Sequence, residues 1–225
     1  MFKNLLSFWK GKDFLSQVFG DFREMLDDGE LVFKLVCDSL LEHTQQPDLK
    51  KRVYEIDGKI NILQKDIRRR IAEHLSLQPT VDVTTALVLM SVVKDAERLG
   101  DYSKNLYEVT ELLQKPIDRE LFAKYFGELD ADIIKLFAQT RQAFIDADEE
   151  MAKQAWSYEK RIAKLCDGVV EQVAKSQLPV NQAVCIALTA RHLKRIVAHL
   201  VNIATSVILP LSDLDYYDEK RLQEQ

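Results

Sequence analysis

The chain has 225 residues, of which 47% are apolar and 30% are charged, so it is long enough to bury a sizeable core. Its formal net charge of −5 argues against a nucleic-acid partner, which usually needs a net basic surface. Seven glycines and five prolines are few for this length. Because these residues mark turns, the composition predicts a small number of long elements.

Several features of the sequence predict a cytoplasmic protein. No run of 18 apolar residues is present, so no membrane-spanning helix is expected. The N-terminus lacks the long apolar segment and cleavage site of a secretory signal. The chain has three cysteines, an odd number, and they are far apart in the sequence: Cys37, Cys166 and Cys185. We therefore expect reduced thiols that lie in the core.

The first element along the chain, residues 1–20, is a basic amphipathic segment. Phe2, Leu5, Leu6 and Trp9 are spaced so that they share one face of a helix, and lysines flank them. Such a segment can lie on a membrane surface, which would place the protein at the inner face of the membrane. It can also be a frayed tail, but we expect its apolar face to dock onto the rest of the protein.

Six long helices follow, because the prolines fall between runs in which apolar residues recur at steps of three and four. Asp82 and Asp118 are candidate N-caps, and Gly127 is a candidate break near the start of the fourth helix. No alternating apolar pattern with hairpin turns indicates a strand. The predicted helices span about residues 13 or 21–43, 48–75, 82–114, 118–145, 148–176 and 181–209.

The order of features is the same in the two halves, which indicates an internal repeat. At an offset of 97 residues, Arg98 aligns with Arg195 and Asn105 with Asn202. Short connections make sequential helices antiparallel. The sequence therefore predicts an all-α fold of two three-helix-bundle repeats with a polar C-terminal tail. The predicted boundaries are 21–115, 116–209 and 210–225.

Two acids on the third helix are the most distinctive candidate site. Glu97 and Asp101 are four residues apart and share a face, where like charges repel unless a bound cation or a basic partner such as Arg98 compensates them. A solvated face with no role is the simplest alternative. In the second half the aligned residues are Lys194 and Ala198, so this half has lost the carboxylates, and the ammonium of Lys194 can replace the charge of a metal.

The residues around these acids resemble the PhoU family. Residues 97–106, Glu-Arg-Leu-Gly-Asp-Tyr-Ser-Lys-Asn-Leu, are similar to the segment Glu-Arg-Ile-Gly-Asp-His-Ala-x-Asn-Ile on the third helix of each family repeat. Residues 57–61, Asp-Gly-Lys-Ile-Asn, resemble the Asp-x-x-Ile-Asp of the second helix, with asparagine in the last position. Residues 191–204 keep the frame of the third helix and lose both acids. The resemblance covers roughly residues 20–208.

The resemblance implies a non-enzymatic, cytoplasmic regulator of phosphate uptake and of phosphate-starvation signalling. Its partner would be the ATPase subunit of a phosphate-specific ABC transporter or a sensor histidine kinase, and a homodimer is expected. Relatives also accompany Pit-type and sodium-coupled phosphate transporters, so an accessory role with one of these is an alternative. A divalent-metal-binding helical protein of another pathway is a second alternative. Enzymatic motifs such as nucleotide-binding glycine loops or His-Glu-x-x-His are missing, and no catalytic residue is expected.

The resemblance also implies a divalent metal or iron in the first repeat only. Oxygen ligands suit hard cations such as Mg²⁺, Mn²⁺ or Ca²⁺, and ferric iron as well. The alternative is a hydrogen-bond network of the same acids with Arg98, Lys94 or Lys104, while Asp95 points away from this face and is left out. The predicted metal ligands are Asp57, Glu97 and Asp101, with Asn61 and Asn105 as weaker oxygen donors.

Overall fold

The structure, a computed structural model, describes residues 13–42, 48–80, 83–114 and 117–214, and every regular element in these ranges is helical. The all-α prediction is therefore confirmed. The predicted amphipathic segment lies outside the described residues up to residue 12, and residues 13–20 belong to the first long helix. Across all described ranges, no helix is long and apolar enough to cross a membrane.

The first three long helices form one bundle, as predicted. They are α2 (Asp13–Glu42), α3 (Leu49–Leu77) and α4 (Val83–Leu112). Their apolar residues recur every three or four positions, which gives each helix a buried face toward the other two. The candidate cap at residue 82 lies outside the described residues.

The predicted fourth helix is two helices, α5 (Arg119–Phe126) and α6 (Leu129–Asp146). The side chain of Asp118 accepts a hydrogen bond from the backbone N–H of Leu121 at 2.7 Å, as expected of an N-cap. Gly127 has a φ of 62°, a left-handed conformation that glycine adopts without the steric cost of a Cβ atom. This residue ends α5, and the chain changes direction before α6 begins.

The second bundle is completed by α7 (Glu149–Ala174) and α8 (Val180–Thr205). Asp148 caps α7 by accepting hydrogen bonds from two backbone N–H groups at 3.0 Å. A short 3₁₀ helix, η1 (Leu211–Asp213), follows α8. Of the predicted polar tail, only residues 210–214 are described, and Leu214 among them is buried against the core.

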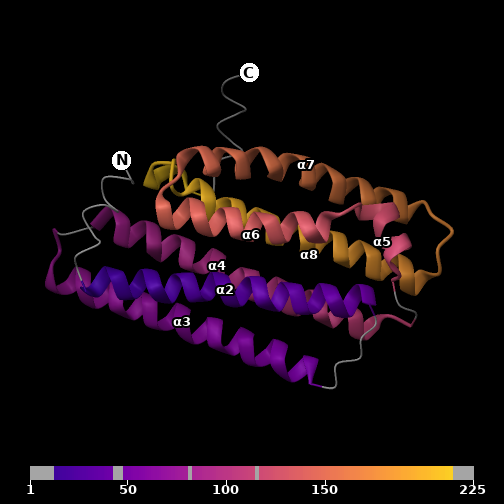
Figure 1. Cartoon of the computed structure of the whole chain (residues 1–225), viewed down its shortest axis with the longest axis horizontal. Helices are drawn as coiled ribbons and strands as arrows, with labels where there is room; N and C mark the ends of the chain where they lie inside the picture. The colour runs from indigo at the N-terminus through magenta and orange to yellow at the C-terminus, as the bar shows by residue number, and fades with distance from the viewer. Residues whose placement is uncertain (1–12, 43–47, 81–82, 115–116, 215–225) are drawn as a thin grey trace.

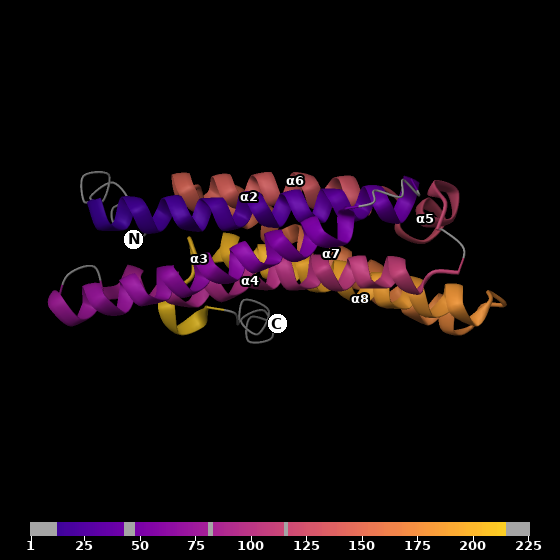
Figure 2. The ribbon, with the colours of Figure 1, turned by 90° about the horizontal axis from the view of Figure 1, so that it is seen from below.

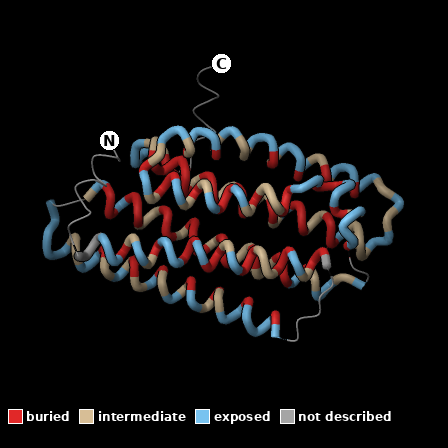
Figure 3. Tube along the Cα trace, viewed as in Figure 1, coloured by how far each residue is buried: buried red, intermediate tan, exposed pale blue. Residues whose placement is uncertain are grey.

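The two bundles lie side by side along their length, with α3 and α7 at opposite edges (Figure 1). Seen from below, α2 lies beside α6 (Figure 2). The Phe22 and Phe144 rings of these two helices are 4.7 Å apart. Arg141 on α6 also donates hydrogen bonds to Asp27 and Glu30 of α2, at 2.6 and 2.8 Å. Buried residues follow the facing sides of the helices, so one core runs through both bundles (Figure 3).

The three cysteines are free and buried, and we expect them to react slowly in the native protein. Burial raises the pKa of each thiol above its ordinary value, in the case of Cys166 to about 12. Because the thiolate is the reactive form, a thiol reagent at pH 8 should label all three quickly only in denaturant. A time course with and without guanidinium measures this, and rapid stoichiometric labelling of the native chain would contradict the buried positions.

Candidate functional site

An ion-pair network joins α3 and α4 at the predicted acidic site. The Nζ atom of Lys104 donates to Asp57 Oδ2 at 2.8 Å and to Asp101 Oδ1 at 3.3 Å. Lys104 and Asp101 are neighbours on one helix face, whereas Asp57 comes from the adjacent helix. Burial alone lowers the pKa of Lys104, but the hydrogen bond and charge of Asp57 and the charge of Asp101 outweigh it and raise the pKa. Lys104 therefore carries a full charge at neutral pH.

Asp57 is buried at this seam, with its two carboxylate oxygens in different surroundings. Besides the lysine, Oδ2 accepts a hydrogen bond from Asn61 Nδ2 at 3.4 Å, while Oδ1 is enclosed without a hydrogen-bond partner. Gly100 explains how the two helices approach so closely. A Cβ atom at this position would lie 2.9 Å from Ile60 Cδ1, so the Ile60 side chain would have to shift to admit a larger residue.

Glu97 and Asp101 are joined through basic side chains of their own helix. Glu97 is buried and accepts a hydrogen bond from Lys94 at 2.7 Å. Arg98 lies between the two acids: it donates to Asp101 at 2.8 Å, and its Nε atom is 3.8 Å from Glu97. The repulsion expected of two like charges at this spacing is thus compensated by cations that the chain itself supplies.

The predicted metal ligands are only partly brought together. Asp57 and Asp101 meet at Lys104, and Asn61 donates to Asp57. Glu97 is paired with Lys94 instead, and Asn105 is half-buried outside this network. Within the described ranges, no group of three or more His, Cys, Asp or Glu side chains is arranged to hold a metal ion. A divalent ion that bound both aspartates would have to occupy the place where the Lys104 ammonium lies. The residues as arranged therefore do not fit a divalent ion. Metal binding here stays a prediction.

A second polar cluster, which the sequence analysis missed, connects the two bundles. Asp95 of α4 is only 5% exposed, and its Oδ1 atom accepts hydrogen bonds from His199 Nδ1 and Asn202 Nδ2 of α8, both at 2.8 Å. Because a carboxylate only accepts hydrogen bonds, Nδ1 of His199 is the donor in this pair. The signal that could have indicated this role is the position of Asp95 among apolar residues on the buried face of α4.

The same interface reflects the internal repeat. The offset of 97 residues maps Asp95 onto His192 and Tyr102 onto His199. The Tyr102 ring lies 5.5 Å from the His199 ring and 6.1 Å from the His192 ring. Arg195 donates to the Tyr102 hydroxyl at 3.3 Å. Exchanging each residue of the Asp95–His199 pair for its aligned residue gives the pair His192–Tyr102, which lies on the same two helices. This is expected if the two repeats pack against each other through equivalent positions.

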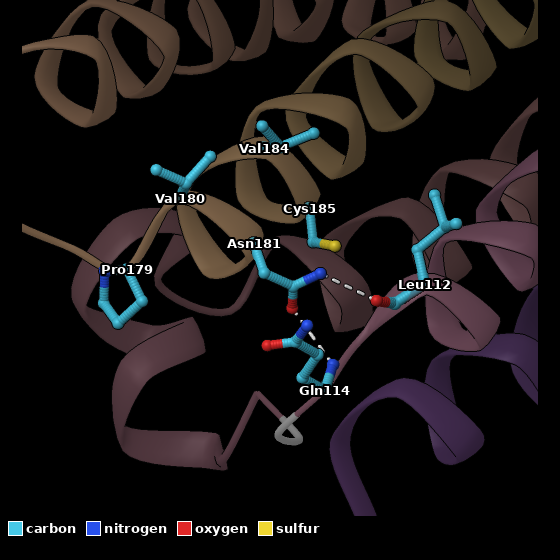
Figure 4. A pocket seen from close by; sticks show the side chains of 7 residues that line it. All are labelled: Leu112, Gln114, Pro179, Val180, Asn181, Val184 and Cys185. Carbon is cyan, nitrogen blue, oxygen red and sulfur yellow. Dashed lines mark hydrogen bonds between the residues drawn. The ribbon is translucent and has the colours of Figure 1, made fainter.

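A surface pocket of about 580 Å³ lies where α4 ends and α8 begins (Figure 4). Asn181 connects the two helices there: its Oδ1 atom accepts from the backbone N–H of Gln114 at 3.0 Å, and its Nδ2 atom donates to the carbonyl of Leu112 at 2.8 Å. Leu112 and Val180 leave much of their apolar surface exposed, 55% and 80%. The pocket is apolar and holds no cluster of titratable groups that would suit catalysis.

Comparisons with known proteins agree on one family. The family model described as "PhoU domain" matches residues 22–110 and 127–207, which is most of both bundles. The Thermotoga maritima protein named phosphate-specific transport system accessory protein PhoU homolog 1 is 24% identical over 196 residues, or 81% of this chain and 83% of that protein. The Escherichia coli K12 protein named phosphate-specific transport system accessory protein PhoU is 22% identical over 200 residues, or 86% and 83%.

Solved structures show the same fold. The crystal structure of PhoU from Pseudomonas aeruginosa superposes with a TM-score of 0.73 at 20% sequence identity, covering 87% of this chain and 95% of that one. The phosphate transport system regulatory protein PhoU from Streptococcus pneumoniae gives a TM-score of 0.71 at 18% identity, with the same coverage. Two three-helix bundles packed side by side are therefore shared with these structures.

Proposed function

The chain belongs to the PhoU family, and from this we propose that it is a non-enzymatic regulator of phosphate uptake and phosphate-starvation signalling. The observation that carries the proposal is the match of the family model to both halves of the chain, in a fold of the same architecture as solved PhoU structures. The names of the relatives place those proteins in phosphate-specific transport systems as accessory components.

The mechanism that we propose is docking. The polar and apolar contacts between the bundles use α2 with α6 and α4 with α8, whereas α3 and α7 lie at the outer edges (Figure 1). The solvent-facing sides of these outer helices are available to a partner. Contact with the ATPase subunit of a transporter, or with a sensor histidine kinase, can change that partner's activity only if the chain binds one of its conformations more tightly than the other.

Capture of partners from the native host tests the proposal. The full chain with an affinity tag is crosslinked in cells grown in ample phosphate, and the proteins recovered from detergent-solubilised membranes are identified by mass spectrometry. We expect an ATPase subunit of a phosphate-specific transporter or a sensor histidine kinase, and an excess of untagged chain should displace it. Recovery of neither would contradict docking, whereas recovery of only a Pit-type or sodium-coupled transporter would support the alternative accessory role.

The other alternative, a metal-binding protein of another pathway, depends on the acids between α3 and α4. Lysine and arginine side chains engage these acids, which is an arrangement that requires no metal ion. The docking proposal does not depend on the outcome of a metal analysis. The outer helices are held in place by the α2–α6 and α4–α8 contacts between the bundles, and the acids between α3 and α4 take no part in these contacts. Elemental analysis of the purified chain and of its Asp101→Ala variant distinguishes the two functions.

A further inference from the structure

The seam between α3 and α4 presents two carboxylates, from different helices, to one ammonium group. The side chains of Asp57, Asp101 and Lys104 are only 11%, 24% and 20% exposed. Two carboxylates held this close in partly buried surroundings repel each other strongly unless a cation lies between them. Lys104 supplies that cation from the last turns of α4, with Nζ within hydrogen-bond distance of both acids.

The second bundle shows the same chemistry at another position. Lys194 of α8 donates to both carboxylate oxygens of Asp167 on α7, at 2.8 and 2.6 Å. In each repeat, therefore, a lysine of the third helix binds an aspartate of the second helix. The two lysines do not align, because Lys194 aligns with Glu97 and not with Lys104. The common feature is an ammonium that joins the same two helices of the bundle.

We propose that Lys104 is a tethered cation that takes the place of a divalent metal ion between Asp57 and Asp101, so that the first repeat is complete without metal. The orientation of Asn61 agrees with this. Its amide Nδ2 donates to Asp57 Oδ2, so the group directed at the carboxylate is a donor and not the oxygen that a metal would need. An added divalent ion would meet the positive charge of Lys104 at short range, which disfavours its entry.

The proposal predicts that removing the ammonium creates a metal site. Lys104→Ala would free Asp101 Oδ1 and leave Asn61 Nδ2 as the donor to Asp57 Oδ2, while Asp57 Oδ1 already lacks a hydrogen-bond partner. These oxygens and water could then coordinate a hard cation. Without added metal, the variant should unfold at a lower temperature than the native chain, because buried Asp57 loses its ion pair with Lys104 while Asp101 keeps the one with Arg98.

The test measures the melting temperature of the full chain in EDTA and in MnCl₂, together with Mn²⁺ binding by electron paramagnetic resonance. The native chain should show no Mn²⁺-dependent shift, whereas Lys104→Ala should gain about 5–10 °C when free Mn²⁺ is 100-fold above its dissociation constant. Adding Asp57→Asn to Lys104→Ala should abolish the gain. Lys104→Gln, which keeps more of the side chain, serves if the alanine variant does not fold in EDTA.

Lys50→Ala is the matched control. Lys50 also joins α3 to α4, through Glu111 at 3.1 Å, but this pair lies in solvent, so the variant should not respond to Mn²⁺. Two results would overturn the proposal. One is a Mn²⁺-dependent gain in the native chain that Asp57→Asn removes, because the acids would then hold metal beside the lysine. The other is a Lys104→Ala variant that melts like the native chain in EDTA and binds no Mn²⁺.

Discussion

Replacing Phe144 with alanine is expected to lower the free energy of unfolding by about 3–5 kcal/mol. Phe144 on α6 is fully buried, and its ring lies 4.7 Å from Phe22 and 5.8 Å from Phe19, both on α2. The variant loses these contacts and leaves a cavity between the two bundles, which long helices packed along their length can close only in part. Denaturant titration followed by circular dichroism measures the loss.

Leu165→Ala is the control for this substitution. Leu165 lies on α7 and is 38% exposed, so its removal should change the free energy of unfolding by no more than about 0.5 kcal/mol. If Phe144→Ala were as mild as this control, Phe144 would not fill the interface between α2 and α6 and the described packing of the two bundles would be wrong.

Asp95→Ala is the polar counterpart and is expected to cost about 2–5 kcal/mol. The variant removes the acceptor of two hydrogen bonds, from His199 Nδ1 and Asn202 Nδ2, and each buried donor that loses its partner costs about 1–3 kcal/mol. Asp95→Asn keeps the shape and an acceptor oxygen, so it should restore a large part of the loss. The same denaturant titration measures all three proteins.

The control for Asp95 is an acid on the protein surface. Asp146 is exposed at the end of α6 and accepts a hydrogen bond from Gln142 only four residues earlier, so Asp146→Ala should leave the stability nearly unchanged. Native stability in Asp95→Ala would show that the α4–α8 interface does not depend on this cluster. The buried apolar residues of α4 and α8 would then account for the packing of the two helices.

The helices could be predicted from the sequence because the signals that define a helix, its apolar spacing and its end residues, lie close together in the chain. Prolines between periodic apolar runs predict the order of the helices and most of their ends. The side chains of Asp118 and Asp148 cap the N-termini of α5 and α7, where an aspartate is favoured. The division of the fourth helix could not be derived from the sequence alone, since a glycine within a helical pattern is often tolerated. Only the left-handed backbone of Gly127 shows that α5 ends there.

From spacing alone, the candidate site could be predicted only within one helix, and it was the resemblance to a family that added Asp57 of the neighbouring helix. The spacing of Glu97 and Asp101 places both acids on one face, which is compatible with compensation by lysine and arginine side chains as well as with a bound cation. Which cation joins α3 to α4 could not be read from spacing, because Lys104 and Asp57 are 47 residues apart. The role of Asp95 was missed for the same reason, since its partners belong to the other repeat.

The proposed regulatory role is tested most directly in the native host, with a reporter gene that responds to phosphate starvation. Deleting the gene for this chain should switch the reporter on in medium with ample phosphate, and expression of the full chain should return it to the repressed level. The Phe144→Ala variant should restore repression only as far as it remains folded. A deletion strain in which the reporter stays repressed in ample phosphate, and responds normally to starvation, would contradict the proposed function.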